Sequence, residues 1–304
     1  MKRALFVIFA LCAILLVANT YWVDSRTRAA DAREGGQIIA TSVVPANVRV
    51  EGSGPVIVLI HGFGAAIDWW DKVTPGLATD HRVISIDLIG HGGTEAPRSG
   101  YTIPRQAQLV VSVLDKLGVD RFAVVGHSMG GEVATAIAEM KPERIERMIL
   151  IDSPPTPATT FTILTDAYLE PVLGEFLTHF QDDRDIHRGL EQGFAPGFPV
   201  PPQFITDFKQ LTYTAFREAH DDSIAYRTEE PTSERLAALK PVPPLLAIFG
   251  TRDRIVPASQ AKYFERVPGA KIAMIEGAGH SPQVETPDKV LELIRELEQA
   301  AQQP

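Results

Sequence analysis

A serine framed by two glycines constrains the fold of this chain more than any other feature. The segment Gly126-His127-Ser128-Met129-Gly130 directly follows the apolar run at residues 122–125, and residues 131–140 have a helical pattern. A strand that turns sharply into a helix leaves no room for side chains beside the turn residue, and glycines remove those clashes. The pattern therefore predicts a strand, a tight turn and a helix, with the Ser128 hydroxyl exposed as a nucleophile.

A serine hydroxyl needs a base that accepts its proton and a third group that orients the base. Asp253 follows the apolar run at residues 245–249, and His280 follows another at residues 272–275. Both side chains are therefore expected on loops at the carboxyl edge of the sheet that carries Ser128. Asp152 also follows an apolar strand and is the alternative acid.

Other residues in these blocks have a structural interpretation. His61, His91 and His127 are expected to brace their own loops or to pack and hydrogen-bond locally. Asp87 and Thr94 belong to a loop that is also interpreted as structural.

Apolar runs separated by helical patterns organise most of the chain. Runs at residues 56–60, 81–86 and 147–151 are continuous, as in strands that are buried on both faces. The alternation predicts an α/β fold, with a mostly parallel central sheet flanked by helices. A short edge strand is expected at Val48-Arg49-Val50, and the segment around 290–297 suits a helix that packs on the sheet.

The alternation lapses between residues 154 and 239. Several windows in this segment have a helical pattern, and we expect a helical cap, inserted after the strand that ends at Ile151, over the catalytic edge. Eight of the fourteen phenylalanines lie in it: Phe161, Phe176, Phe180, Phe194, Phe198, Phe204, Phe208 and Phe216. These rings can line an apolar substrate site, but for any single ring packing within the cap is the favoured interpretation.

The amino terminus has the pattern of a targeting segment. Lys2 and Arg3 precede an apolar stretch from Ala4 to Ala18. Residues 1–23 are either an uncleaved anchor, long enough to cross about 30 Å of hydrocarbon, or a signal peptide that is removed. The catalytic domain is then membrane-anchored outside the cytoplasm or secreted, with a cytosolic protein as the remaining alternative.

The expected division of the chain follows from these segments. It consists of the anchor or signal at 1–23, a polar linker at 24–45, the first part of the core at 46–153, the cap at 154–239 and the second part of the core at 240–304.

Composition argues against several classes of ligand. The formal net charge of −9 gives no reason to expect a nucleic acid as partner. Cys12, the only cysteine, lies in the amino-terminal apolar stretch, so neither a disulfide within the chain nor a cysteine metal site is expected. Phosphate-binding and zinc-binding motifs are lacking in the sequence, and we expect neither a cofactor nor a metal.

Five blocks together resemble the α/β-hydrolase family, and within it the serine esterase and lipase branch. They lie at residues 61–64, 87–92, 126–131, 250–253 and 279–280, and the resemblance extends from about Val48 to about Glu296 apart from the insertion. The order Ser128, Asp253, His280 is the order of that family. The resemblance implies that these three residues are catalytic and that the backbone N–H groups of Phe63 and Met129 form an oxyanion hole.

The resemblance also implies a reaction. It favours cleavage of a small or medium carboxylic ester, with an apolar acyl or aromatic group, through an acyl-enzyme; thioesters and lactones use the same machinery. Similar sequences cleave carbon–carbon bonds in ring-fission products or make peracids as cofactor-free haloperoxidases, and both stay open as alternatives. A catalytically silent ligand-binding scaffold is a more distant alternative. The sequence indicates neither the substrate nor the oligomeric state.

Overall fold

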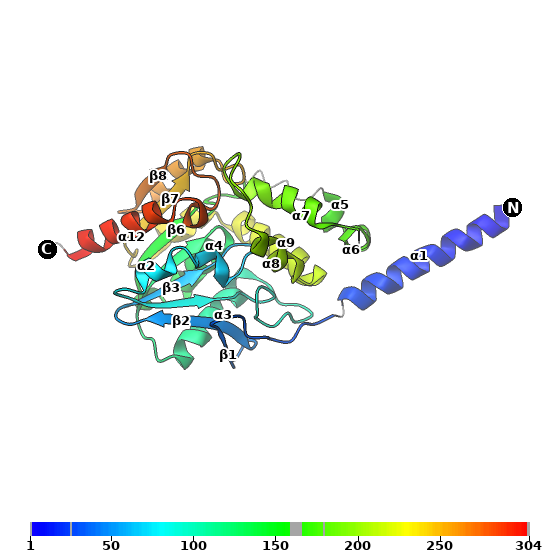
Figure 1. The fold of residues 1–304 in the computed structure, drawn as a ribbon, viewed down its shortest axis with the longest axis horizontal. Helices are drawn as coiled ribbons and strands as arrows, with labels where there is room; N and C mark the ends of the chain where they lie inside the picture. Colours follow the sequence, from blue (N-terminus) through cyan, green and yellow to red (C-terminus); the bar gives the residue numbers. More distant parts are fainter. Residues whose placement is uncertain (1, 25, 159–165, 179, 303–304) are drawn as a thin grey trace.

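The computed structural model describes residues 2–24, 26–158, 166–178 and 180–302 (Figure 1). Its centre is an eight-stranded sheet with the order β1-β2-β4-β3-β5-β6-β7-β8. The pairs β1/β2 and β2/β4 are antiparallel, and all other pairs are parallel, as the alternating pattern predicts. The strands are β1 (Gln37–Ile39), β2 (Ala46–Gly52), β3 (Val56–Ile60), β4 (Arg82–Ile86), β5 (Phe122–His127), β6 (Ile145–Ile151), β7 (Leu245–Gly250) and β8 (Lys271–Ile275).

The helices lie between and after the strands. The α-helices are α1 (Lys2–Asp24), α2 (Thr74–Leu77), α3 (Ile103–Lys116), α4 (Met129–Met140), α5 (Asp166–Leu169), α6 (Pro171–Thr178), α7 (Asp183–Leu190), α8 (Pro202–Lys209), α9 (Tyr213–Glu229), α10 (Thr232–Ala238), α11 (Pro282–Glu285) and α12 (Pro287–Gln302). Short 3₁₀ segments are η1 (Ile67–Trp70), η2 (Pro142–Arg144), η3 (Glu191–Gly193) and η4 (Ala258–Arg266).

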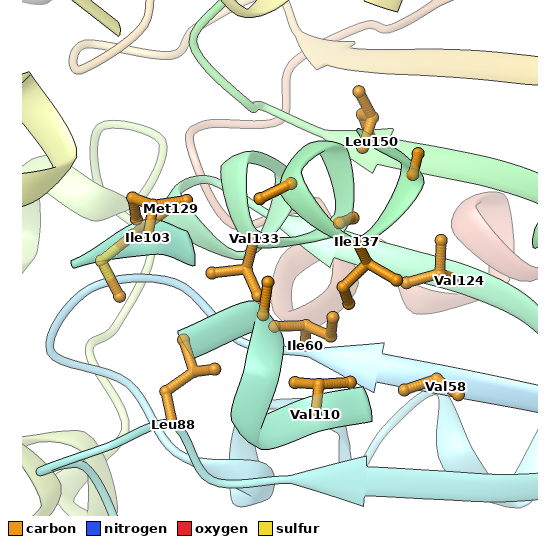
Figure 2. Close-up of a cluster of buried hydrophobic side chains, with 14 of the residues drawn as sticks. Val58, Ile60, Leu88, Ile103, Val110, Val124, Met129, Val133, Ile137 and Leu150 are labelled. Carbon is orange, nitrogen blue, oxygen red and sulfur yellow. The ribbon is translucent and has the colours of Figure 1, made fainter. Parts of the chain in front are cut away.

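The central strands are buried on both faces, which explains their continuous apolar sequences. Val58 and Ile60 of β3 pack on the side of α3 and α4, where Figure 2 shows them beside Val110, Val133 and Ile137. Successive residues of a strand point to opposite faces, and the residues between them therefore pack on the other side of the sheet. That second cluster includes residues of α12 at positions 290, 293, 294 and 297, as predicted for the carboxyl-terminal helix.

The edge of the sheet differs from the prediction. Gln37 of β1 pairs with Val48 of β2, so the edge strand is β1, and it lies inside the 24–45 segment that was predicted to be a linker. The same segment is fixed further upstream, because the Asp31 N–H donates to the Gly93 carbonyl at 2.9 Å. Backbone pairing needs no apolar pattern, and a three-residue strand is too short to leave one.

Between β6 and β7 the described residues 152–158, 166–178 and 180–244 contain the helices α5 to α10 and no strand. The phenylalanines of this segment lie in two kinds of environment. Phe194 and Phe204 are buried and stack with Trp69 of the core, with ring centroids 6.0 and 3.9 Å from the tryptophan ring. Phe176 and Phe180 are exposed. Phe161 lies outside the described residues.

Helix α1 projects away from the rest of the molecule (Figure 1). Its window Leu5–Trp22 has a mean hydropathy of 2.2, and 6% of that window is buried. By length and composition the helix could cross a membrane or be a signal sequence. Its carboxyl-terminal part contacts α6 and α9.

Candidate active site

Ser128 lies at the turn between β5 and α4, as the glycine pattern predicts. Its φ of 51° is in the left-handed region, which non-glycine residues rarely adopt. The flanking glycines are needed for packing: a Cβ on Gly126 would lie 2.5 Å from the Gly130 carbonyl oxygen, and one on Gly130 would collide with the Ile60 carbonyl oxygen. The turn is therefore held against β3 as well as between its own strand and helix.

His280 and Asp253 meet after the last two strands of the sheet. Asp253 Oδ2 lies 2.8 Å from His280 Nδ1, and both side chains are buried. The other oxygen of Asp253 accepts hydrogen bonds from the backbone N–H groups of Ile255 and Val256, at 2.7 and 3.0 Å. Three hydrogen bonds thus orient this carboxylate toward the imidazole, and His280 lines the same cavity as Ser128.

Asp152, the alternative acid, follows β6 with a φ of 44° and is fully buried. Its Oδ1 accepts a hydrogen bond from the Gly250 N–H at 2.9 Å, while Asp253 makes the hydrogen bond to His280. Burial, and then the charge of Asp253, raise the pKa of Asp152 well above its usual range. The geometry favours Asp253 over Asp152 as the partner of the histidine.

Donor atoms of Asp152, Asp253 and His280 all lie within 4.8 Å of one another. This is the one grouping among the described residues with spacing that suits a metal ion. The His280–Asp253 hydrogen bond already joins two of the three donors, so the arrangement fits a hydrogen-bonded histidine–carboxylate pair better than a set of metal ligands.

The two residues expected to supply oxyanion donors lie beside Ser128. Phe63 and Met129 both line the cavity, and Met129 is the first residue of α4, whose amino terminus favours negative charge. Gly62 lets the loop after β3 approach the turn, because a Cβ there would lie 2.9 Å from His127 Nδ1 and 3.1 Å from Ser128 Cβ.

His61 braces the loop that carries Phe63. Burial lowers the pKa of His61 to about 4, so the ring is neutral. In that state Nδ1 donates to the Gly62 carbonyl at 2.8 Å and Nε2 accepts from the Leu88 N–H at 3.0 Å. Asp87 fixes the neighbouring loop by accepting from the N–H groups of Ile67 and Gly93, both at 2.8 Å.

His127 has a role that the sequence did not indicate. Its Nε2 lies 2.6 Å from the His280 carbonyl oxygen, so it ties the serine turn directly to the histidine loop. The expectation of local contacts is wrong here. The partner lies 153 residues away, so the residues around position 127 do not indicate it.

The cavity has mainly apolar walls and one polar side. Trp69, Leu190 and Ile224 contribute apolar surface, the last two from the inserted helices α7 and α9. Glu132 of α4 and Arg227 of α9 form the polar side, with Arg227 Nη1 2.6 Å from Glu132 Oε1. Burial raises the pKa of Glu132, and the charge of Arg227 opposes that rise. No local pattern in the sequence predicts this pair either.

Comparison with known proteins gives a coherent result. A family profile described as "alpha/beta hydrolase fold" matches residues 55–287. An uncharacterised protein of Mycobacterium tuberculosis is 27% identical over 259 residues, which covers 81% of this chain and 76% of that protein.

Two solved structures share the fold. A meta-cleavage product hydrolase from Pseudomonas fluorescens has a TM-score of 0.75 and 22% identity, and the match covers 88% of this chain and 99% of that chain. A bacterial membrane phospholipase A has a TM-score of 0.73 and 22% identity, and the match covers both chains completely.

Proposed function

Because this chain belongs to the α/β hydrolase family, we propose that it is a serine hydrolase that cleaves a carboxylic ester through an acyl-enzyme. One observation carries the proposal: His280, bound to Asp253 at 2.8 Å through Nδ1, lines the same cavity as Ser128. With Nδ1 engaged, Nε2 is the nitrogen left to accept the serine proton.

The reaction follows from this arrangement. His280 Nε2 takes the proton of Ser128 Oγ as that oxygen attacks the ester carbonyl carbon, and Asp253 stabilises the imidazolium. The N–H groups of Phe63 and Met129 bind the oxyanion, each donor contributing about 10²–10³ in rate. His280 then gives its proton to the leaving alcohol. Water, deprotonated by His280, attacks the acyl-enzyme and releases the acid and Ser128.

The walls of the cavity support an apolar acyl or aromatic group. Trp69 and Phe63 contribute rings from the core, while Leu190 and Ile224 come from the inserted helices. We therefore assign residues 154–239 the role of a cap that supplies part of the substrate site.

Helix α1 is proposed to be a membrane anchor that holds the catalytic domain outside the cytoplasm. The exposure of Leu5–Trp22 and the charges of Lys2 and Arg3 before it support this assignment. The membrane phospholipase A also supports it, since the match covers that whole chain and this one, α1 included. Cleavage of the segment as a signal peptide is the alternative.

A carbon–carbon bond hydrolase is the second candidate, and the fold match to a meta-cleavage product hydrolase favours it. Such an enzyme would use the same serine and histidine side chains on a ring-fission product instead of an ester. The two candidates differ in which substrates are turned over.

The test is turnover of p-nitrophenyl esters of increasing acyl length by the full chain in detergent. We expect hydrolysis that the S128A variant loses and that S112A, a serine hydrogen-bonded to Ser42 outside the cavity, retains. A folded wild-type protein that hydrolyses none of these esters would contradict the proposal. Turnover of a ring-fission product by that same protein would establish the second candidate.

A further inference from the structure

An exposed apolar patch lies on the inserted helices. Seven large apolar side chains outside α1 are exposed among the described residues, and four of them lie between positions 172 and 180. We call these four the α6 patch: Val172, Leu173, Phe176 and Phe180. The rings of Phe176 and Phe180 contact each other edge to face, 5.0 Å apart. Exposed apolar surface gathered in one place marks a binding face.

The α6 patch adjoins α1. Leu15 and Leu16 of α1 line one groove together with Leu173, Phe176 and Phe180. Figure 1 shows α6 on the side of the molecule from which α1 projects. The patch thus continues the apolar surface of the one described helix that is long and apolar enough to cross a membrane.

A polar contact fixes α6 beside α1. Asn19 Nδ2 donates to Glu175 Oε1 at 2.5 Å, and the Glu175 side chain is buried. The contact lies near the carboxyl end of the apolar window, where Trp22 stacks under the Arg26 guanidinium at 3.6 Å. Tryptophan and arginine at the end of such a window suit the headgroup region.

The depth of the α6 patch follows from helix geometry. Leu15 lies seven residues before Trp22, which corresponds to about 10 Å along a helix at about 1.5 Å per residue. If Trp22 marks the headgroup level, the groove around Leu15 lies among the acyl chains. Amphipathic helices at membrane surfaces enter to about 5–10 Å, which is the same range.

We propose that the α6 patch inserts into the outer leaflet of the membrane that α1 spans, so that the cap rests on the lipid and takes its ester substrate from the bilayer. The occupant of the patch is therefore lipid acyl chains, and the substrate class is an acyl ester of a membrane lipid. This inference rests on the proposed ester hydrolysis for its substrate and on the proposed anchor for its geometry.

A second cavity adjoins the proposed catalytic cavity on the side of α6. It lies between α6 and α9 and is lined by Thr178 and Phe216 among others. The Phe216 ring lies 5.4 Å from the ring of Phe63, which lines the cavity of Ser128. The rings of Phe63 and Phe216 thus form a two-residue wall between the second cavity and the proposed catalytic cavity.

The docking is tested with a fluorescent label on the full chain in lipid vesicles. The only cysteine is first removed as C12A, and F176C is labelled with an environment-sensitive dye such as NBD. Met274 of β8 is the matched control, since it is 45% exposed and Phe176 is 43% exposed. We expect a blue-shifted emission that acyl-chain nitroxide lipids quench for position 176 and not for position 274.

Two outcomes would overturn the docking. Equal emission and equal quenching at the two positions would show that the α6 patch stays in water. A blue shift in detergent that grows with protein concentration, without quenching in vesicles, would assign the patch to a second copy of this chain.

The substrate class is tested with the F176D variant and with M274D as its control. We expect F176D to hydrolyse a diacyl lipid ester in vesicles about tenfold more slowly than M274D, while both hydrolyse p-nitrophenyl butyrate at the wild-type rate. An unchanged rate on vesicles would refute delivery from the bilayer. If the wild-type protein does not hydrolyse p-nitrophenyl butyrate, the proposed function is refuted. The fluorescence result at position 176 does not alter that conclusion.

Discussion

Replacing Arg227 by methionine tests whether the Glu132–Arg227 pair joins the inserted helices to the core. The pair links α9 to α4 at 2.6 Å, and its side chains are 5% and 0% exposed. Ser223 Oγ donates to the second carboxylate oxygen at 2.8 Å. Methionine keeps most of the apolar stem, so R227M leaves Glu132 buried with its charge uncompensated.

The expected cost follows from that burial. Removing one partner of a buried ion pair lowers the free energy of unfolding by about 3–5 kcal/mol, because the remaining charge stays buried without a compensating charge. An exposed pair contributes only about 0–1 kcal/mol. Arg266 and Glu234 form such a pair, with side chains 59% and 51% exposed, so R266M is the control.

The decrease in the free energy of unfolding that R227M causes depends on pH. Burial already raises the pKa of Glu132, and the removal of Arg227 raises it further. A carboxyl group with a pKa that is higher in the folded than in the unfolded state binds more protons when folded, so stability falls as pH rises toward the folded value. We therefore expect a smaller deficit at pH 5 than at pH 8.

Urea unfolding of the full chain in detergent, followed by tryptophan fluorescence at both pH values, measures these differences. A deficit for R227M below about 1 kcal/mol at pH 8, or one that does not change with pH, would refute the reasoning. A deficit of equal size in R266M would show that loss of positive charge, rather than burial, is responsible.

Three further predictions concern the serine turn and its acids. D253N should lower kcat on p-nitrophenyl esters by about 10³–10⁴ with little change in KM, because His280 loses the acceptor that fixes its tautomer; a kcat within tenfold of wild type would contradict the role of Asp253. G130A should lower the free energy of unfolding by about 1–3 kcal/mol in a urea titration, because its methyl group collides with the Ile60 carbonyl, whereas G193A, with nothing within 4 Å, should have a much smaller effect. The raised pKa of Asp152 means that the stability of the wild type falls as pH rises above the unfolded pKa of an aspartate, so the stability difference between D152N and the wild type in urea should shift in favour of D152N from pH 5 to pH 9; a difference that is the same at the two pH values would contradict this.

The parts of the fold that sequence could predict are those fixed by short-range sterics. A side chain at Gly126 or Gly130 would collide with backbone atoms within or beside the turn. The glycine pattern around Ser128 therefore indicates the geometry of that turn directly. Continuous apolar runs report strands that are buried on both faces, and β3 shows why, with alternate residues in two separate clusters.

The parts that sequence left open depend on partners far away in the chain. Asp152 and Asp253 each follow a strand, and β6 and β7 are neighbours, so only the direction of the side chains decides which acid meets His280. The contact of Arg227 with Glu132 spans 95 residues. Pairings of this kind are set by tertiary packing, which no local pattern records.

The order of the sheet has a consequence for biosynthesis. From β3 onward the strands β3, β5, β6, β7 and β8 lie side by side in the order of the chain, so each strand that emerges from the ribosome meets an edge that is already formed. The turn of Ser128 packs against β3 early in this succession, whereas Asp253 and His280 arrive with the last two strands. Under the proposed mechanism, a nascent chain therefore has the serine turn before it has the acid and the base, and Ser128 becomes reactive only after the inserted helices have been synthesised.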